Sequence, residues 1–303
     1  MSKRWLWTVA MAAVFALASG VQAQTTQEAQ SSGGSTVAEA QSGTPAQPED
    51  PNTGALTLTG GVDWTTAYFF RGYNQEDGGL ILQPYATLTA NVYNSDKFNI
   101  NVYGGTWNSF QSAKTGSDGN GPSSWYECDL FGGVDFSFDK FTVGVIYTFY
   151  QYPNGAFKTI QEVGFKLSYD DTDLMKKTGV SFGLKPYVGV YIETDDGNGT
   201  EDTYAEVGIG PSWTIHGVTL SVPVAVGMSL DDYYLQSDGS NSFFGYGSIS
   251  LLGSIPLPIP ARYGAWTLTA GVQYLYLFAD SAEAANNGEN DQWIGKVGVA
   301  FSY

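Results

Sequence analysis

The chain has 303 residues, and its 30 acidic and 13 basic residues give a net charge of −17 and a pI near 4.1. So acidic a chain is a poor partner for nucleic acid or another anionic surface, whereas cations and neutral solutes suit it. A single cysteine, Cys128, excludes an intramolecular disulfide.

The first residues predict an exported protein. A short basic segment precedes an apolar stretch over residues 5–18, and small residues suited to signal peptidase lead up to Ala23. We expect residues 1–23 to be a signal peptide. Residues 24–54 are rich in Gln, Ser, Thr, Gly, Ala and Pro, which predicts a disordered polar tail in the periplasm. Residues 55–303 then form one domain.

From residue 55 onward the sequence alternates with a period of two, as β-strands with one apolar face do. The clearest stretches are 218–230 and 293–303, where large apolar residues alternate with small or polar ones. No apolar run here is long enough for a membrane-spanning helix. With these two, the expected strands number about twelve, an even number as in bacterial outer-membrane barrels. The others are 56–71, 80–93, 98–111, 125–138, 141–152, 157–169, 180–193, 204–215, 243–255 and 266–278.

The connections alternate in length, which predicts an all-β, transmembrane up-and-down antiparallel β-barrel with both termini in the periplasm. Short turns are expected at 94–97, 139–140 and 216–217, with longer ones at 170–179 and 256–263. Longer polar loops are expected at 72–79, 112–124, 194–203, 231–242 and 280–290, and only the connection at 153–156 is short in this set. A soluble sandwich is the alternative, but it needs a second sheet to cover the apolar face and does not explain this alternation.

Aromatic residues near the strand ends suggest two interfacial girdles, although aromatics are also good strand formers. One group lies toward the longer loops: Tyr68, Phe69, Phe70, Tyr147, Phe149, Tyr150, Tyr274, Tyr276 and Phe278. The other lies toward the short turns: Phe98, Phe138, Phe141, Tyr169 and Tyr303.

Residues 66–79, which include Tyr68-Phe69-Phe70-Arg71-Gly72, resemble the opening motif of the TorF-like porins, also called the Gcw_chp family. Gln83, the 103–107 and 147–153 segments and Glu162 follow in the order and spacing of that family, over about residues 60–169. The chain departs from the family at Ala67, where an acidic residue is common, and in its long polar tail. The resemblance implies an outer-membrane barrel and a pore, without catalytic residues.

Charged residues of the barrel are expected on the lumen side, because a charge facing lipid costs a few kcal/mol near the midplane. The expected pore-lining residues are Asp63, Arg71, Glu127, Asp129, Asp135, Lys158, Glu162, Lys166, Lys185, Glu193, Glu206 and Lys296. These charges either line a water-filled passage or neutralise one another across a narrow barrel. Bulky neighbours that would narrow the lumen are Gln83, Tyr85, Tyr103, Trp107, Tyr187 and Tyr191.

The sequence favours a porin-like channel for ions or small hydrophilic solutes, with a mild cation preference. A non-conducting barrel with a structural or adhesin-like role is the alternative. No enzyme and no cofactor are expected, because the sole histidine, His216, falls in a short turn and Cys128 faces lipid. The expected partners are outer-membrane lipid and small solutes or cations, and a monomer is preferred.

The longer loops are acidic, which either concentrates cations at the mouth or keeps the loops solvated. In one of these loops, Asp196, Asn198 and Glu201 place oxygen ligands near glycines. They form a weak candidate calcium site without the full sequence of a calcium-binding loop.

Overall fold

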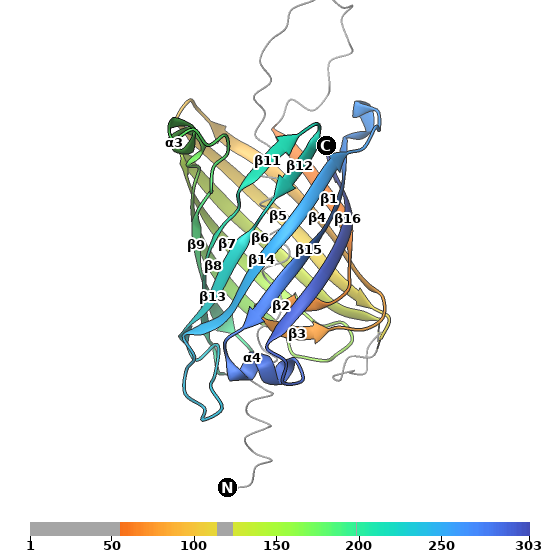
Figure 1. Ribbon diagram of the computed structural model, residues 1–303, viewed down its shortest axis with the longest axis vertical. Helices are drawn as coiled ribbons and strands as arrows, with labels where there is room; N and C mark the ends of the chain where they lie inside the picture. The colour runs from red at the N-terminus through yellow and green to blue at the C-terminus, as the bar shows by residue number, and fades with distance from the viewer. Residues whose placement is uncertain (1–54, 114–123, 198) are drawn as a thin grey trace, which may run out of the picture.

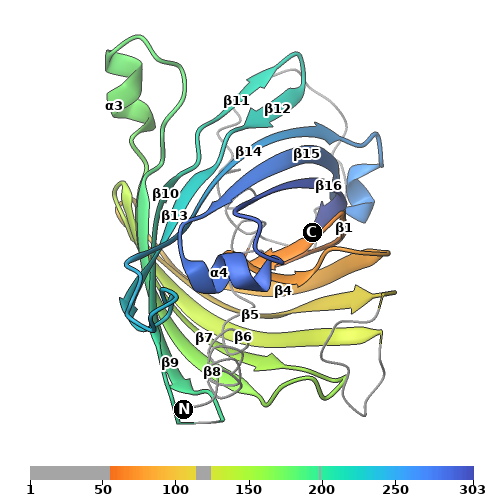
Figure 2. The ribbon, with the colours of Figure 1, turned by 60° about the horizontal axis from the view of Figure 1, so that its bottom comes forward.

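A computed structural model describes residues 55–113, 124–197 and 199–303, which form an antiparallel β-barrel (Figure 1, Figure 2). The predicted signal peptide and polar tail, residues 1–54, lie outside the described residues. Within the described ranges, no helix is both long and apolar enough to cross a membrane.

The barrel wall has 12 strands, which confirms the predicted fold class and strand number. Each strand is antiparallel to its neighbours, and β1 pairs with β16 to close the sheet, with Thr59 opposite Ser302. The strands of the wall are β1 Leu56–Thr65, β4 Ile81–Asn94, β5 Phe98–Gln111, β6 Trp125–Phe138, β7 Phe141–Gln151, β8 Ile160–Tyr169, β9 Tyr187–Asp195, β10 Thr203–Ile209 with β11 Ser212–Ile215, β12 Val218–Ser221 with β13 Val224–Asp231, β14 Phe244–Pro256, β15 Ala265–Leu277 and β16 Asp291–Ser302.

Two strands of the wall are each divided in two by a proline. Pro211 separates β10 from β11, and Pro223 separates β12 from β13. Proline has no N–H group to donate to the sheet, so the ladder is interrupted there. The two breaks face each other, since the Val222 amide donates to the Pro211 carbonyl at 3.0 Å.

Three predicted strands are wrong in their limits, and one of them, expected over 157–169, begins at Ile160 as β8. The strand expected over 56–71 ends at Thr65, and the chain then forms the separate hairpin of β2 (Tyr68–Phe70) and β3 (Tyr73–Glu76). The strand expected over 180–193 begins only at Tyr187, because Lys185 has a positive φ of 52° and Pro186 follows it. Short helices stand outside the wall: α3 Thr172–Lys177, the 3₁₀ helix η1 Ala261–Tyr263 and α4 Asp280–Ala285.

The outer surface of the barrel is apolar around its whole circumference, as a lipid environment requires. Exposed large apolar side chains include Trp64, Leu88, Leu130, Phe165, Leu251 and Trp293. Phe149 and Phe278 are exposed near one end of the barrel, and Phe138 and Tyr303 near the other. The girdle assignment is wrong for Tyr68, Phe69, Phe70 and Tyr150, which are buried inside the barrel.

The inner face is built from tyrosines that lie directly across the ladder from glycines. Such pairs join neighbouring strands at Gly61–Tyr85, Gly133–Tyr103, Gly164–Tyr191, Gly208–Tyr187 and Gly227–Tyr246. A Cβ atom on Gly133 would come within 2.5 Å of the Tyr103 ring, and one on Gly208 within 2.6 Å of the Tyr187 ring. Each ring therefore occupies the space that a side chain on the glycine would take.

We expect Gly133→Ala to destabilise the barrel by about 1–3 kcal/mol, because the new methyl group lies 2.5 Å from both the Tyr103 ring and the Val145 backbone carbonyl. The matched control is Gly132→Ala on the same strand, where the nearest heavy atom lies 3.5 Å from the new Cβ. Urea titration of the refolded protein, followed by tryptophan emission, measures both. Equal losses in the two variants would contradict the ring-on-glycine packing.

Candidate functional site

The candidate site is a plug of side chains at the end of the barrel opposite the C-terminus, where Figure 1 labels β2, β3 and α4. The β2–β3 hairpin folds into the lumen, so residues 67–71 are at most 6% exposed. At its turn, Arg71 and Gly72 have φ angles of 46° and 86°, as the central residues of a type I′ turn do. The hairpin carries Arg71 to the middle of the lumen.

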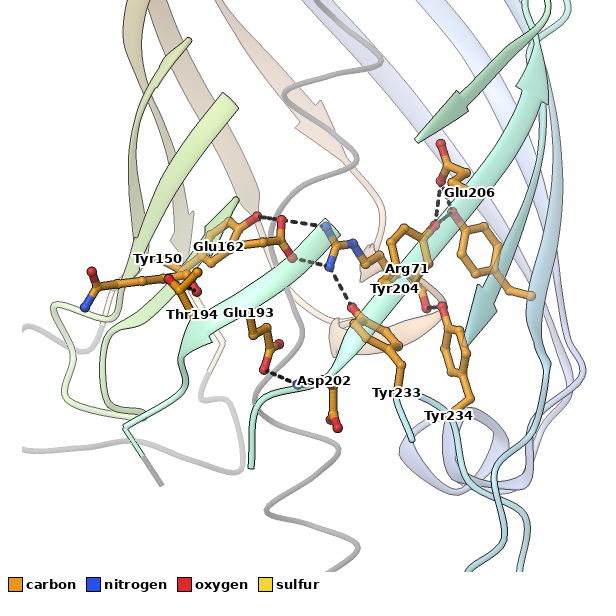
Figure 3. A network of polar contacts seen from close by, with 12 residues as sticks. Arg71, Tyr150, Glu162, Glu193, Thr194, Asp202, Tyr204, Glu206, Tyr233 and Tyr234 are labelled. Atoms are coloured by element: carbon orange, nitrogen blue, oxygen red, sulfur yellow. Dashed lines mark hydrogen bonds and ion pairs between the residues drawn. The ribbon is translucent and has the colours of Figure 1, made fainter. Parts of the chain in front are cut away.

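Arg71 forms a bidentate ion pair with Glu162 on the β8 wall (Figure 3). Its Nη1 and Nη2 atoms donate to the two carboxylate oxygens at 2.7 and 2.9 Å. Nη1 also donates to the Tyr233 hydroxyl at 3.1 Å, and the Tyr150 hydroxyl donates to Glu162 at 2.8 Å. Both charged side chains are buried, at 2% and 3% exposure, so this geometry offsets the cost of removing them from water.

Aromatic rings enclose the guanidinium. Its carbon lies 4.2 Å from the ring centre of Tyr204, 4.7 Å from Phe70, 4.8 Å from Tyr191 and 5.4 Å from Tyr233. Rings at these distances attract a cation through their negative faces, and the attraction grows when water is excluded. Arg71 is thus held by one carboxylate and by rings from the hairpin, the wall and a loop.

A second buried carboxylate, Glu206 on β10, is held by tyrosines of the wall. Tyr204 and Tyr246 both donate to one oxygen at 2.6 Å, and Tyr187 donates to the other at 2.7 Å. Charge-assisted hydrogen bonds of this kind stabilise an ionised carboxylate away from water.

The loop over residues 232–243 and helix α4 complete the plug. Tyr234 donates to the Arg71 carbonyl at 2.7 Å, and Tyr73 donates to the Tyr233 carbonyl at 3.0 Å. The Tyr73 hydroxyl also lies 3.0 Å from Ser281 Oγ on α4. The hairpin, loop and helix are therefore one hydrogen-bonded unit.

The lumen is less crowded away from the plug. Along β6, Glu127 and Asp129 are buried, whereas Asp135 is partly exposed. Along β8, Glu162 is buried and Lys166 is partly exposed. The inner wall thus runs from a buried end to a solvated end near the C-terminus.

The structure places most of the predicted lumen residues on the inner face. Asp63 and Lys296 form an ion pair of 2.7 Å between β1 and β16, and Lys166 Nζ lies 4.3 Å from the ring centre of Tyr187. The bulky residues expected to narrow the lumen also face inward: Gln83, Tyr85, Tyr103, Trp107, Tyr187 and Tyr191.

Two of the expected pore-lining residues, Lys158 and Lys185, lie outside the strands of the wall. Lys158 is exposed in the connection between β7 and β8, and its Nζ donates to the Gly197 carbonyl. Lys185 precedes β9 at a positive φ, in a segment where Asp171 accepts its backbone N–H. Neither is on a strand of the wall, because glycines and prolines delay the start of β8 and β9.

In the loop of the weak calcium candidate, the Asp196 carboxylate is engaged in local hydrogen bonds. Asp196 accepts from the Gly199 and Thr200 amides and from the Thr200 hydroxyl, so both its oxygens serve the turn. Asn198 lies outside the described residues. Among the residues that are described, no group of three or more His, Cys, Asp or Glu side chains is arranged to hold a metal ion.

At the plugged end, Asp202 lies among other acids in the connection between β9 and β10. Its backbone N–H donates to Glu193 at 3.3 Å (Figure 3). Burial, together with the nearby carboxylates of Asp232, Asp231 and Asp196, raises the pKa of Asp202 to about 7. The charge at this mouth therefore changes near neutral pH.

The sequence alone does not predict the roles of Tyr233 and Tyr234 or the inward fold of the hairpin. A signal was present at residues 67–70, where four apolar residues follow one another without the alternation of a lipid-facing strand. His216 does lie in the turn between β11 and β12, with an exposed side chain.

No family model matches the chain, and no curated protein matches it. Among solved structures it resembles an outer membrane channel from Pseudomonas putida F1, with 9% identity, 82% of this chain and 95% of that chain covered, and a TM-score of 0.48. It also resembles outer membrane phospholipase A from Escherichia coli, with 13% identity, 84% and 94% covered, and a TM-score of 0.41. The NanC porin matches with 14% identity, 82% and 99% covered, and a TM-score of 0.36.

We expect Glu162→Gln to lower the free energy of unfolding by about 3–5 kcal/mol, because it leaves the buried guanidinium without its counter-charge. The control is Asp173→Asn, which removes the exposed ion pair with Lys140 and is expected to change stability little. Urea titration in detergent micelles gives both values. A loss no larger in Glu162→Gln than in the control would show that the ion pair does not anchor the plug.

Proposed function

We propose that the chain is a narrow outer-membrane channel of the porin type, which passes ions or small hydrophilic solutes with a mild preference for cations. One observation carries this proposal: a charged inner wall lies behind an outer surface that is apolar on every side. Such a wall suits water and solutes, whereas a barrel that only stabilised itself could fill its lumen with apolar side chains.

The proposed cation preference rests on the sign of the inner charges. Acids on the inner face outnumber bases: Asp63, Glu127, Asp129, Asp135, Glu162, Glu193 and Glu206 stand against Arg71, Lys166 and Lys296. A net negative wall raises the local concentration of cations and repels anions. Membership of the TorF-like family is a hypothesis that rests on the residue motifs around Arg71.

The plug favours a second candidate, a barrel that does not conduct and has a structural or surface-binding role. Arg71, Glu162 and Glu206 are all paired, so the plug has the contacts of a stable closure. We further propose that the protein has no catalytic role and requires no cofactor, and that a monomer is its working state.

Single-channel recording in a planar bilayer, with a salt gradient to read the reversal potential, tests the channel. We expect small discrete steps and a cation-leaning reversal potential. Arg71→Ala should enlarge the steps and strengthen the cation preference, because it frees the hairpin and removes a positive charge from the lumen. Arg262→Ala, in η1 at the other end, is the matched control. Folded wild-type barrels that never conduct would instead support the structural role.

The cation preference at the plugged end of the barrel should increase as the pH rises through neutrality. Because the pKa of Asp202 is raised to about 7, its carboxyl is protonated below that pH and charged above it. We expect the cation preference to rise from about pH 6 to about pH 8. Asp202→Asn should flatten this rise without changing the preference at the lower pH. A rise of unchanged size in the variant would exclude Asp202 as its source.

A further inference from the structure

A second group of buried polar side chains lies on the inner wall beside the plug, across β4, β5 and β6. Glu127 lies opposite Ser109, and Asp129 lies opposite Trp107. On β4, Ile81 pairs with Gln111 and Tyr85 pairs with Trp107, so Gln83 lies level with Ser109. Gln83, Ser109 and Glu127 thus form one row on the inner face, with Asp129 in the next row. Gln83 and Glu127 are 0% exposed, and Asp129 is 1% exposed.

A β-bulge shapes this group. The ladder between β5 and β6 shifts after Ser109, so the consecutive side chains of Tyr126 and Glu127 are both buried inside. Tyr68 of the hairpin donates to one Glu127 oxygen at 2.8 Å, and its ring centre lies 5.3 Å from that of Trp107. The group is therefore walled by aromatic rings and carries its carboxylates at a fixed position.

Apart from the contact between the Glu127 and Asp129 carboxyls, several polar atoms of the group have no hydrogen-bond partner in the described part of the chain. They are both amide atoms of Gln83, Oε1 of Glu127, both oxygens of Asp129 and Oε1 of Gln111. A buried polar atom without a partner costs one to several kcal/mol, roughly, and a buried charge costs more. Apart from the Gln83 amide nitrogen, all these atoms are acceptors.

The two buried carboxylates of the plug, unlike Glu127 and Asp129, each have a cation or several hydroxyl groups as partners. Glu162 has the Arg71 guanidinium, and Glu206 has three tyrosine hydroxyls. No lysine or arginine of the described ranges forms an ion pair with Glu127 or Asp129, although their carboxyls contact each other. Two touching carboxyl groups in a buried site are both ionised only when a cation lies between them, and without one they share a proton.

We propose that Gln83, Glu127 and Asp129 bind one hard divalent cation of the calcium class. Two carboxylates match a charge of +2, and oxygen ligands favour hard cations over transition metals. Calcium accepts irregular oxygen geometry, whereas magnesium demands a regular octahedron. The full burial of the group favours a bare ion over an organic solute. This inference rests on the proposed channel function, because it names a cation that the inner wall would bind. The binding itself is measurable whether or not the barrel conducts.

Terbium luminescence tests the site, because Tb³⁺ replaces Ca²⁺ at oxygen sites and is excited through nearby rings such as Trp107 and Tyr68. The full chain, refolded in detergent, is titrated with Tb³⁺ under tryptophan excitation. We expect a saturable signal with one ion per chain, displaced by Ca²⁺ and not by K⁺. The double variant Glu127→Gln/Asp129→Asn should lose it.

Two control variants separate this site from other acids. Asp135→Asn removes a carboxylate farther along β6, and Asp196→Asn removes the loop candidate; both should keep the signal. Heat modifiability on gels shows that each variant is folded. If the double variant does not fold, the wild-type barrel tests the site alone: Ca²⁺ must raise its unfolding temperature.

A signal that survives in the double variant, or that disappears in Asp196→Asn, would overturn the proposal. So would a folded wild-type barrel with no saturable signal and no Ca²⁺-dependent shift, since the two carboxyls then share a proton. Binding in a barrel that never conducts would refute the channel and keep the site. Conduction without cation binding would refute the site and keep the channel.

Discussion

A sheet in an apolar environment has no water to satisfy the amides of its edges, and this constraint governs the whole molecule. The pairing of β1 with β16 meets it by joining the first strand of the wall to the last. Closure then fixes which side chains face outward, because successive residues of every strand point to opposite sides. The apolar outer surface and the charged lumen both follow from the closed ladder.

Closure also creates an interior that must be filled or wetted. At one end it is filled by segments that leave the wall, and the Arg71–Glu162 pair joins the hairpin to β8. A charged pair in such a place is stable only when its remaining hydrogen-bonding capacity is used, and Tyr150 and Tyr233 use part of it. At the other end the inner residues remain partly exposed, so one barrel combines a packed half with a solvated half.

The architecture was predictable from the sequence because the period of two is a local property that repeats along every strand. The charges of the inner face followed from the same alternation, which places Glu127, Glu162 and Glu206 correctly inside. The plug was not predictable, since the four consecutive apolar residues 67–70 argue against a lipid-facing strand but do not say where the chain goes instead. Only the partners contributed by distant segments, such as Glu162 and Tyr233, decide that the hairpin folds inward. The starts of β8 and β9 were missed because turn residues there override strand propensity.

The pairing of inner tyrosines with glycines across the ladder has a consequence for how this barrel can change. Shortening Tyr187 would widen the bore, but it would also strip cover from Gly208, while enlarging the glycine is blocked as long as the ring stays. The two positions depend on each other, so a single substitution at either one leaves a void or a clash and lowers stability. Evolution or engineering of the bore should therefore proceed by exchanges at both positions together, and aligned relatives should show the two residues varying in concert.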